Sequence, residues 1–124
     1  MSRVEPEELV ERLRAVCLAL PEVTEKVSHG SPSWFVRKMF VSYVGYHHGD
    51  EHLALWVAAP EGAQEEMVAA EPDRFFVPPY VGHRGWIGLR LDVEPDGPDW
   101  DEVREVVTDA YRHIAPKRLA ALVI

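Results

Sequence analysis

Residues 33–58 read SWFVRKMFVSYVGYHHGDEHLALWVA and contain three runs rich in aromatic and β-branched residues. The runs are Ser33–Val36, Met39–Tyr46 and Leu53–Ala58, and a Gly-Asp-Glu sequence separates the last two. Runs of this composition between turn-forming residues are typical of β-strands. We therefore predict three strands here, the last two of them joined as a hairpin.

Helical patterns lie on both sides of this stretch. Apolar residues recur at helical spacing over residues 6–20, and a helix there must end before Pro21. A second helix is predicted from Pro60 to the residue before Pro72, and a third follows Asp99, its expected N-cap. The remaining segments are read as a connection over residues 22–32, strands at Phe75–Val77 and Trp86–Val93, and a short terminal helix over residues 116–122.

The predicted order is helix, three strands, helix, two strands, helix and a short C-terminal helix. Strands in runs, without regular βαβ alternation, indicate an α+β fold with an antiparallel sheet. Because each helix has one apolar stripe, we expect a two-layer sandwich of sheet and helices. The 124 residues are predicted to form a single domain over residues 1–124.

The charge is acidic overall but unevenly distributed. The 13 Lys and Arg residues against 21 Asp and Glu give a formal net charge of −8, which argues against a wholly basic nucleic-acid module or a polybasic membrane binder. Residues 29–49, 74–91 and 110–124 nevertheless contain basic residues and no acid. These stretches could meet in a basic surface, or they could reflect only the preference of helices for glutamate.

Several functional classes lack their sequence signatures. The single cysteine, Cys17, provides no disulfide framework and is expected to be a small buried hydrophobe. No leader peptide, membrane-spanning run, P-loop or dinucleotide fingerprint is recognisable. We therefore expect a cytoplasmic protein without a cofactor.

Two groups of histidines invite a chemical interpretation. His47, His48 and His52 surround the predicted hairpin turn and could bind zinc or nickel, although exposed hairpin tips commonly collect polar residues. Ser28 and His29 suggest hydrolase chemistry, but no nucleophile-elbow motif accompanies them. We assign no metal site and no catalytic residue.

The most unusual stretch is Tyr80–Trp86, in which Gly82 and Gly85 bracket His83 and Arg84. Such a loop can bring backbone close to a ligand and offer aromatic rings for stacking. The alternative is a glycine-shaped turn whose tryptophan packs in the core.

Lys117 and Arg118 lie in the first turn of the terminal helix, where free N–H groups suit an anion. Alternatively, both side chains reach back to the carbonyls that end the preceding helix.

Three stretches resemble the motifs of the MmcQ/YjbR family. Residues 28–40 resemble its HGxPxF…KxF segment, residues 72–86 its DPxRF…PxY…GW segment and residues 110–119 its SYR…APK segment. With Leu20-Pro21 at the start, the resemblance spans residues 18–119. The chain departs from the pattern at Ala110, where the family often has Ser, and at Trp56, where it often has Lys.

The resemblance implies the element order predicted above, a fold similar to type III secretion chaperones and a bacterial source. Members of the family are described as predicted DNA-binding proteins with a double-wing motif. Family motifs also include Tyr111, which joins the candidate site residues on that ground.

We thus expect a monomeric, non-enzymatic binding protein. The leading hypothesis is weak, salt-sensitive DNA binding without sequence specificity, with phosphate contacts from Arg37, Lys38, Arg84, Lys117 and Arg118. The alternative is a module for a small molecule, such as a small anionic ligand, or for a peptide, with a site drawn from His29, Gly30, Tyr80, His83, Gly85, Trp86 and Tyr111. A concave pocket joining His29, Lys38 and Trp86 would favour the second hypothesis, and a convex basic surface the first.

Overall fold

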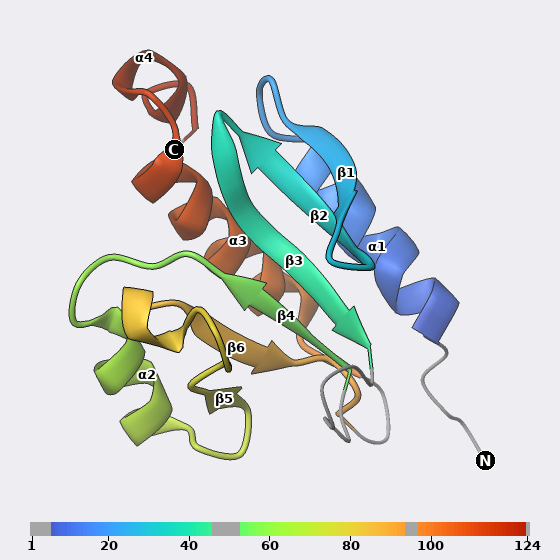
Figure 1. Cartoon of the computed structure of the whole chain (residues 1–124), viewed down its shortest axis with the longest axis vertical. Coiled ribbons are helices and arrows are strands. Elements are labelled where there is room, and N and C mark those ends of the chain that lie inside the picture. Colours follow the sequence, from blue (N-terminus) through green and yellow to red (C-terminus); the bar gives the residue numbers. More distant parts are fainter. Residues whose placement is uncertain (1–5, 46–52, 94–96, 124) are drawn as a thin grey trace.

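Six strands form one antiparallel sheet in the order β1-β2-β3-β4-β6-β5 (Figure 1). The structure is a computed structural model that describes residues 6–45, 53–93 and 97–123. The strands are β1 Thr24–Ser28, β2 Ser31–Val36, β3 Lys38–Gly45, β4 Leu53–Val57, β5 Phe75–Phe76 and β6 Ile87–Arg90. The predicted hairpin is confirmed, since β3 and β4 pair antiparallel from Val41↔Val57 to Gly45↔Leu53.

The two long helices lie together against one face of the sheet, behind it in Figure 1. The helices are α1 Pro6–Leu18, α2 Ala63–Ala70, the 3₁₀ turn η1 Gly82–Arg84, α3 Trp100–Ile114 and α4 Lys117–Ala120. The core between helices and sheet includes Leu13, Phe40 and Tyr111, whose ring meets that of Phe40 edge-on at 5.7 Å between centroids. The predicted α+β class is confirmed. No helix in the described residues is long and apolar enough to cross a membrane.

Residues 24–28 are a strand, so the reading of residues 22–32 as a connection is wrong there. The two-residue turn His29-Gly30 joins β1 to β2, and both residues have positive φ, 51° and 79°. Positive φ at both central positions is the requirement of a type I′ hairpin turn, whose twist matches that of the strands. The strand is hard to recognise because β1 is the mostly exposed edge of the sheet and therefore lacks an apolar run.

The other boundaries differ from the predictions by a few residues. Helix α1 ends at Leu18, two residues before the predicted end. Helix α2 begins at Ala63 because the left-handed Gly62 precedes it, whereas the sequence suggested a start at Pro60. The N-cap of α3 is confirmed: Asp99 accepts hydrogen bonds from the backbone N–H groups of Asp101 and Glu102, at 2.9 and 3.4 Å.

A polar cluster fastens β1 and β2 to α1. The Trp34 side chain is fully buried, and its Nε1–H donates to Glu25 Oε1 at 2.9 Å. Arg14 of α1 donates from Nε to the same oxygen at 2.8 Å and from Nη2 to Oε2 at 3.0 Å. The Arg14 hydrogen bond, followed by that of Trp34, lowers the pKa of Glu25 against the opposing effect of partial burial. The Glu25 carboxylate of β1 thus stays charged where it binds Arg14 of α1 and Trp34 of β2.

We predict that Cys17 does not react with a thiol reagent in the folded protein. Its side chain is fully buried, as the sequence suggested, and burial raises the pKa of the thiol, with the charge of Glu25 adding to the effect. Because the thiolate is the reactive form, reaction with dithionitrobenzoate should await unfolding. Release of thionitrobenzoate should follow the urea unfolding curve, and fast stoichiometric labelling in buffer would contradict this.

Candidate functional site

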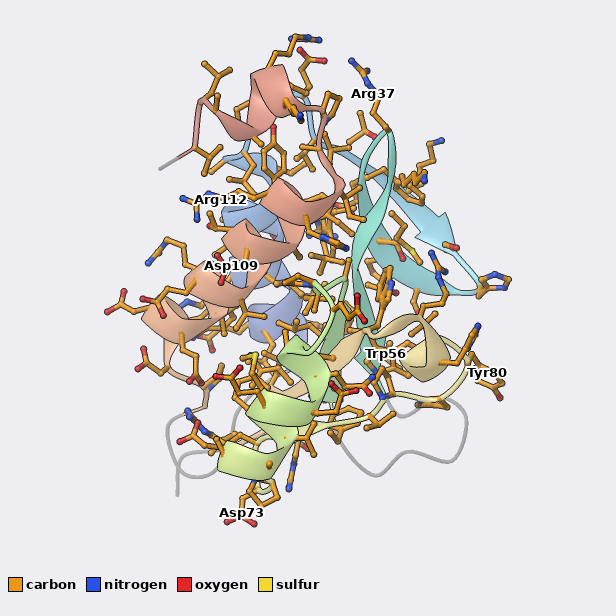
Figure 2. The ribbon with its side chains drawn as sticks, turned by 90° about the vertical axis from the view of Figure 1, so that its left-hand side faces the viewer. Arg37, Trp56, Asp73, Tyr80, Asp109 and Arg112 are labelled. Carbon is orange, nitrogen blue, oxygen red and sulfur yellow. The ribbon has the colours of Figure 1, made fainter. Side chains whose placement is uncertain are left out.

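A pocket of about 410 Å³ lies on the face of the sheet opposite α1 and α3. Strands β1 to β4 and the segment between Tyr80 and Trp86 form it. Figure 2 shows Trp56 inside this region, with Tyr80 at its outer edge. The lining residues are Ser28, His29, Ser31, Met39, Ser42, Val44, Trp56, Tyr80, Val81, Arg84 and Trp86.

A register shift in the sheet brings Met39 and Ser42 to the same pocket. Trp34 pairs with Val41 and Phe35 pairs with Met39, so Phe40 is an extra residue on β3. In a regular strand, residues three apart point to opposite faces, and a bulge of one residue restores them to the same face. The bulge therefore allows Phe40 to reach Tyr111 in the core while Met39 and Ser42 line the pocket.

Serine hydroxyls form the polar part of the pocket floor. Ser31, Ser33 and Ser42 are the buried polar residues of the described chain, with exposed fractions of 6%, 0% and 7%. Ser33 Oγ donates to the backbone oxygen of Ser31 at 3.1 Å and lies 3.0 Å from Ser42 Oγ. A buried hydroxyl without a hydrogen-bond partner destabilises the fold. These two hydrogen bonds therefore fix the orientations of the Ser33 and Ser42 hydroxyls beneath the pocket.

Gln64 of α2 holds the loop that closes the pocket. Its Nε2 donates to the backbone oxygens of Gly82 at 2.8 Å and Trp86 at 2.7 Å, using both N–H bonds of the amide. A Cβ on Gly82 would lie 2.6 Å from Val77 Cγ1, so any larger residue there would require the exposed Val77 side chain to shift. Gly85 ends η1 with φ 85°. The loop is thus fixed at both ends of its 3₁₀ turn.

Arg84 lies over the Trp86 ring at the pocket. The guanidinium carbon of Arg84 lies 5.5 Å from the centroid of the Trp86 ring. Trp86 is 3% exposed and Arg84 is exposed, and no salt bridge of Arg84 occurs among the described residues. Trp86 is buried, as the reading of this loop as a glycine-shaped turn expects, and it also lines the pocket, whereas a ligand-binding role of the loop stays a prediction.

Two pocket residues have unfavourable backbone conformations. His29 and Tyr80 have φ of 51° and 66°, and such values are uncommon for residues other than glycine. Glu22 and Arg37, which lie outside the pocket lining, also have positive φ, so this conformation does not by itself distinguish the pocket. The hairpin turn after β1 and the loop before η1 each place one such side chain at the pocket.

The structure brings together part of the predicted ligand site. His29, Tyr80, Arg84 and Trp86 line the pocket, whereas Gly30, His83, Gly85 and Lys38 do not. Tyr111 lies in the core, where its hydroxyl donates to the Pro21 oxygen at 2.8 Å. Sequence reasoning missed Gln64, Ser31 and Ser42. The available signal for the two serines is that they are polar residues in largely apolar strands, whereas Gln64 lies beside other polar residues in helix α2 and gives no such signal.

The five predicted phosphate contacts do not form one surface. Glu22 pairs with Arg37 at 3.7 Å and with Arg118 at 3.3 Å, so the β2–β3 turn and α4 share one end of the molecule. Lys38 and Lys117 are their exposed sequence neighbours. Arg84 belongs to η1, well below that end in both views, which share a vertical axis (Figures 1 and 2). Neither Lys117 nor Arg118 makes a hydrogen bond to the end of α3 within the described residues.

No three His, Cys, Asp or Glu side chains come together as a metal site in the part of the chain that the structure describes. The predicted cluster of His47, His48 and His52 lies outside that part.

The chain matches the YjbR family over residues 18–113. Among solved structures it is similar to a Deinococcus radiodurans protein, DR2400, which contains a DUF419 domain. The similarity has a TM-score of 0.68 at 18% sequence identity and covers 92% of this chain and 86% of that one, so it shows a shared fold. No curated protein matches the chain.

Proposed function

The chain belongs to the YjbR family, and we propose that it is a non-enzymatic binding protein that holds a small molecule in the pocket beneath the Tyr80–Trp86 loop. The observation that carries the proposal is the pocket itself, about 410 Å³ in volume. This lies within the range of about 300–1,000 Å³ that is usual for small-molecule sites. A mostly apolar lining with a few polar groups is also typical of such sites.

Structural features around the pocket support a role in ligand binding rather than in the stability of the fold alone. The β-bulge and the Gln64 hydrogen bonds both shape this cavity, and the turns at His29 and Tyr80 place their side chains at it.

DNA binding is less well supported as the main function. Arg37 of the β2–β3 turn and Arg118 of α4 share Glu22, whose carboxylate would also repel a phosphate. Four phosphate contacts there would release fewer counterions than the five contacts expected from the sequence. The slope of the logarithm of the binding constant against the logarithm of salt concentration would be about −3.6 on duplex DNA. DNA is therefore included as a competing ligand in the test.

The test is a thermal-shift screen with nucleotides, small aromatic and aliphatic acids, peptides and short DNA duplexes. A ligand at 100 times its Kd stabilises the folded state by about 2.7 kcal/mol, enough to raise Tm by several degrees. We expect a small molecule to do so for the natural chain. Met39→Trp, which fills the pocket, should abolish that shift.

The control is Val27→Trp, which adds the same ring to an exposed residue outside the pocket lining. It should retain the shift. Stabilisation by DNA alone, lost on replacing Arg37 and Arg118 but kept in Met39→Trp, would overturn the proposal. So would a small-molecule shift that survives Met39→Trp unchanged.

A further inference from the structure

We infer that the ligand of this pocket is a small aromatic acid that carries a hydroxyl or amino group, with its oxyanion on Arg84 and its N–H or O–H on Ser42. The inference rests on the proposed function and adds the chemical class of the ligand. It follows from which groups at the pocket can donate a hydrogen bond, which can accept one, and what lies between them.

The rim of the pocket favours a negative charge. The guanidinium carbon of Arg84 lies 5.5 Å from the centroid of the Trp86 ring, and the exposed Arg84 lines the pocket. A guanidinium carries parallel N–H donors that match the two oxygens of a carboxylate or phosphate. Within the described residues, the pocket lining contains no Asp or Glu that would compete with an incoming oxyanion.

The floor of the pocket offers the ligand a hydrogen-bond acceptor. Ser33 has one hydroxyl proton, and the backbone oxygen of Ser31 accepts it at 3.1 Å. The 3.0 Å contact between the two hydroxyls must then use the proton of Ser42. Ser42 Oγ therefore offers lone pairs, and no proton, to the pocket that it lines. A ligand N–H or O–H satisfies this acceptor.

The body of the ligand lies between apolar and aromatic walls. Trp56 and Trp86 are 7% and 3% exposed. Trp56 lies on β4 and Trp86 directly precedes β6, and these two strands are neighbours because Trp56 pairs with Gly88. Met39, Val44 and Val81 complete the apolar lining. Indole rings prefer offset or edge contacts with another aromatic ring, which favours a planar aromatic body.

The experiment titrates the ¹⁵N-labelled full chain with 4-hydroxybenzoate, benzoate and 4-hydroxybenzamide. The chain has four tryptophans, and their indole N–H signals report position once they are assigned by single Trp→Phe replacements. We expect 4-hydroxybenzoate to shift the signals of Trp56 and Trp86. The signals of Trp34, buried on the helix side, and of Trp100 on α3 should stay in place.

The three compounds separate the two contacts. The amide should bind at least about tenfold more weakly than 4-hydroxybenzoate, the loss expected for a charge-assisted hydrogen bond. Benzoate should bind about three- to tenfold more weakly, as for a neutral hydrogen bond. Arg84→Gln should remove the preference for the acid over the amide, and Ser42→Ala the preference for the hydroxyl compound.

Arg104→Gln is the matched control, since Arg104 is an exposed arginine of α3 outside the pocket lining. It should leave all three affinities unchanged. Equal binding of acid and amide to the natural chain would overturn the ligand class while leaving the pocket proposal intact, and this comparison needs no variant to fold. If neither these compounds nor any in the screen shifts Trp56 and Trp86, the pocket proposal itself fails.

Discussion

Replacement of Trp34 by alanine is expected to destabilise the fold by about 3–5 kcal/mol, the range for removing a large buried aromatic side chain. Trp34 is fully buried on β2 and also donates to Glu25 Oε1. The variant loses the ring and leaves a cavity between β2 and α1. Urea unfolding followed by far-ultraviolet circular dichroism measures the loss without relying on tryptophan fluorescence.

Trp34→Phe separates the packing of the ring from its hydrogen bond. It keeps most of the apolar surface and loses the donor to a charged group, for which we expect about 1.5–3 kcal/mol. The pKa of Glu25 is lowered in part by this hydrogen bond. A lowered folded-state pKa gives stability that is present above the unfolded pKa and is lost as the pH falls through the folded one.

The pH dependence therefore provides a second readout for Trp34→Phe. In the variant the pKa of Glu25 lies closer to its unfolded value, so less stability should be lost between neutral and acid pH than in the natural chain. Parallel stability curves for the two proteins across that range would show that the Trp34 hydrogen bond does not act on Glu25. A loss in Trp34→Ala below 1 kcal/mol would contradict the packing argument.

The sequence predicts those parts of the fold that bury apolar side chains. Strands β3 and β4 read as aromatic and β-branched runs because both faces of the sheet are covered there, by α3 on one side and the loop over Trp56 on the other. Strand β1 was not predicted because an edge strand is held by backbone hydrogen bonds. Its mostly exposed side chains show no apolar pattern from which the pairing could be inferred. The His29-Gly30 turn was the available signal.

The sequence predicts those residues of the candidate site whose chemical type by itself suggests ligand binding. Tyr80, Arg84 and Trp86 stand out in and beside the Gly82–Gly85 turn, and all three line the pocket. The shared face of Met39 and Ser42 depends on a bulge, which the sequence alone does not place. Likewise, Gln64 meets Gly82 across 18 residues of chain, a contact set by how α2 folds back on the loop.

Gln64→Glu is expected to weaken ligand binding, and to destabilise the observed position of the Tyr80–Trp86 loop, by about 2–4 kcal/mol. The cause is the loss of two hydrogen bonds and the repulsion that replaces them. The substitution changes little in shape, but it turns the donor that meets the Gly82 and Trp86 oxygens into an acceptor. The loop that carries Arg84 should then leave its closed position. Hydrogen exchange at residues 80–86 and the affinity for 4-hydroxybenzoate measure the two effects.

The direction of the pH dependence identifies the cause. An ionised carboxyl facing two carbonyl oxygens is disfavoured, so its folded-state pKa should rise, and the deficit should shrink as the pH falls and the group is protonated. Gln64→Met, which loses the donors without gaining charge, should show a smaller deficit that is independent of pH. Ala69→Glu adds the same charge to an exposed position of α2 and should change neither measurement. A Gln64→Glu variant that binds as tightly as the natural chain would mean that the amide does not hold the loop.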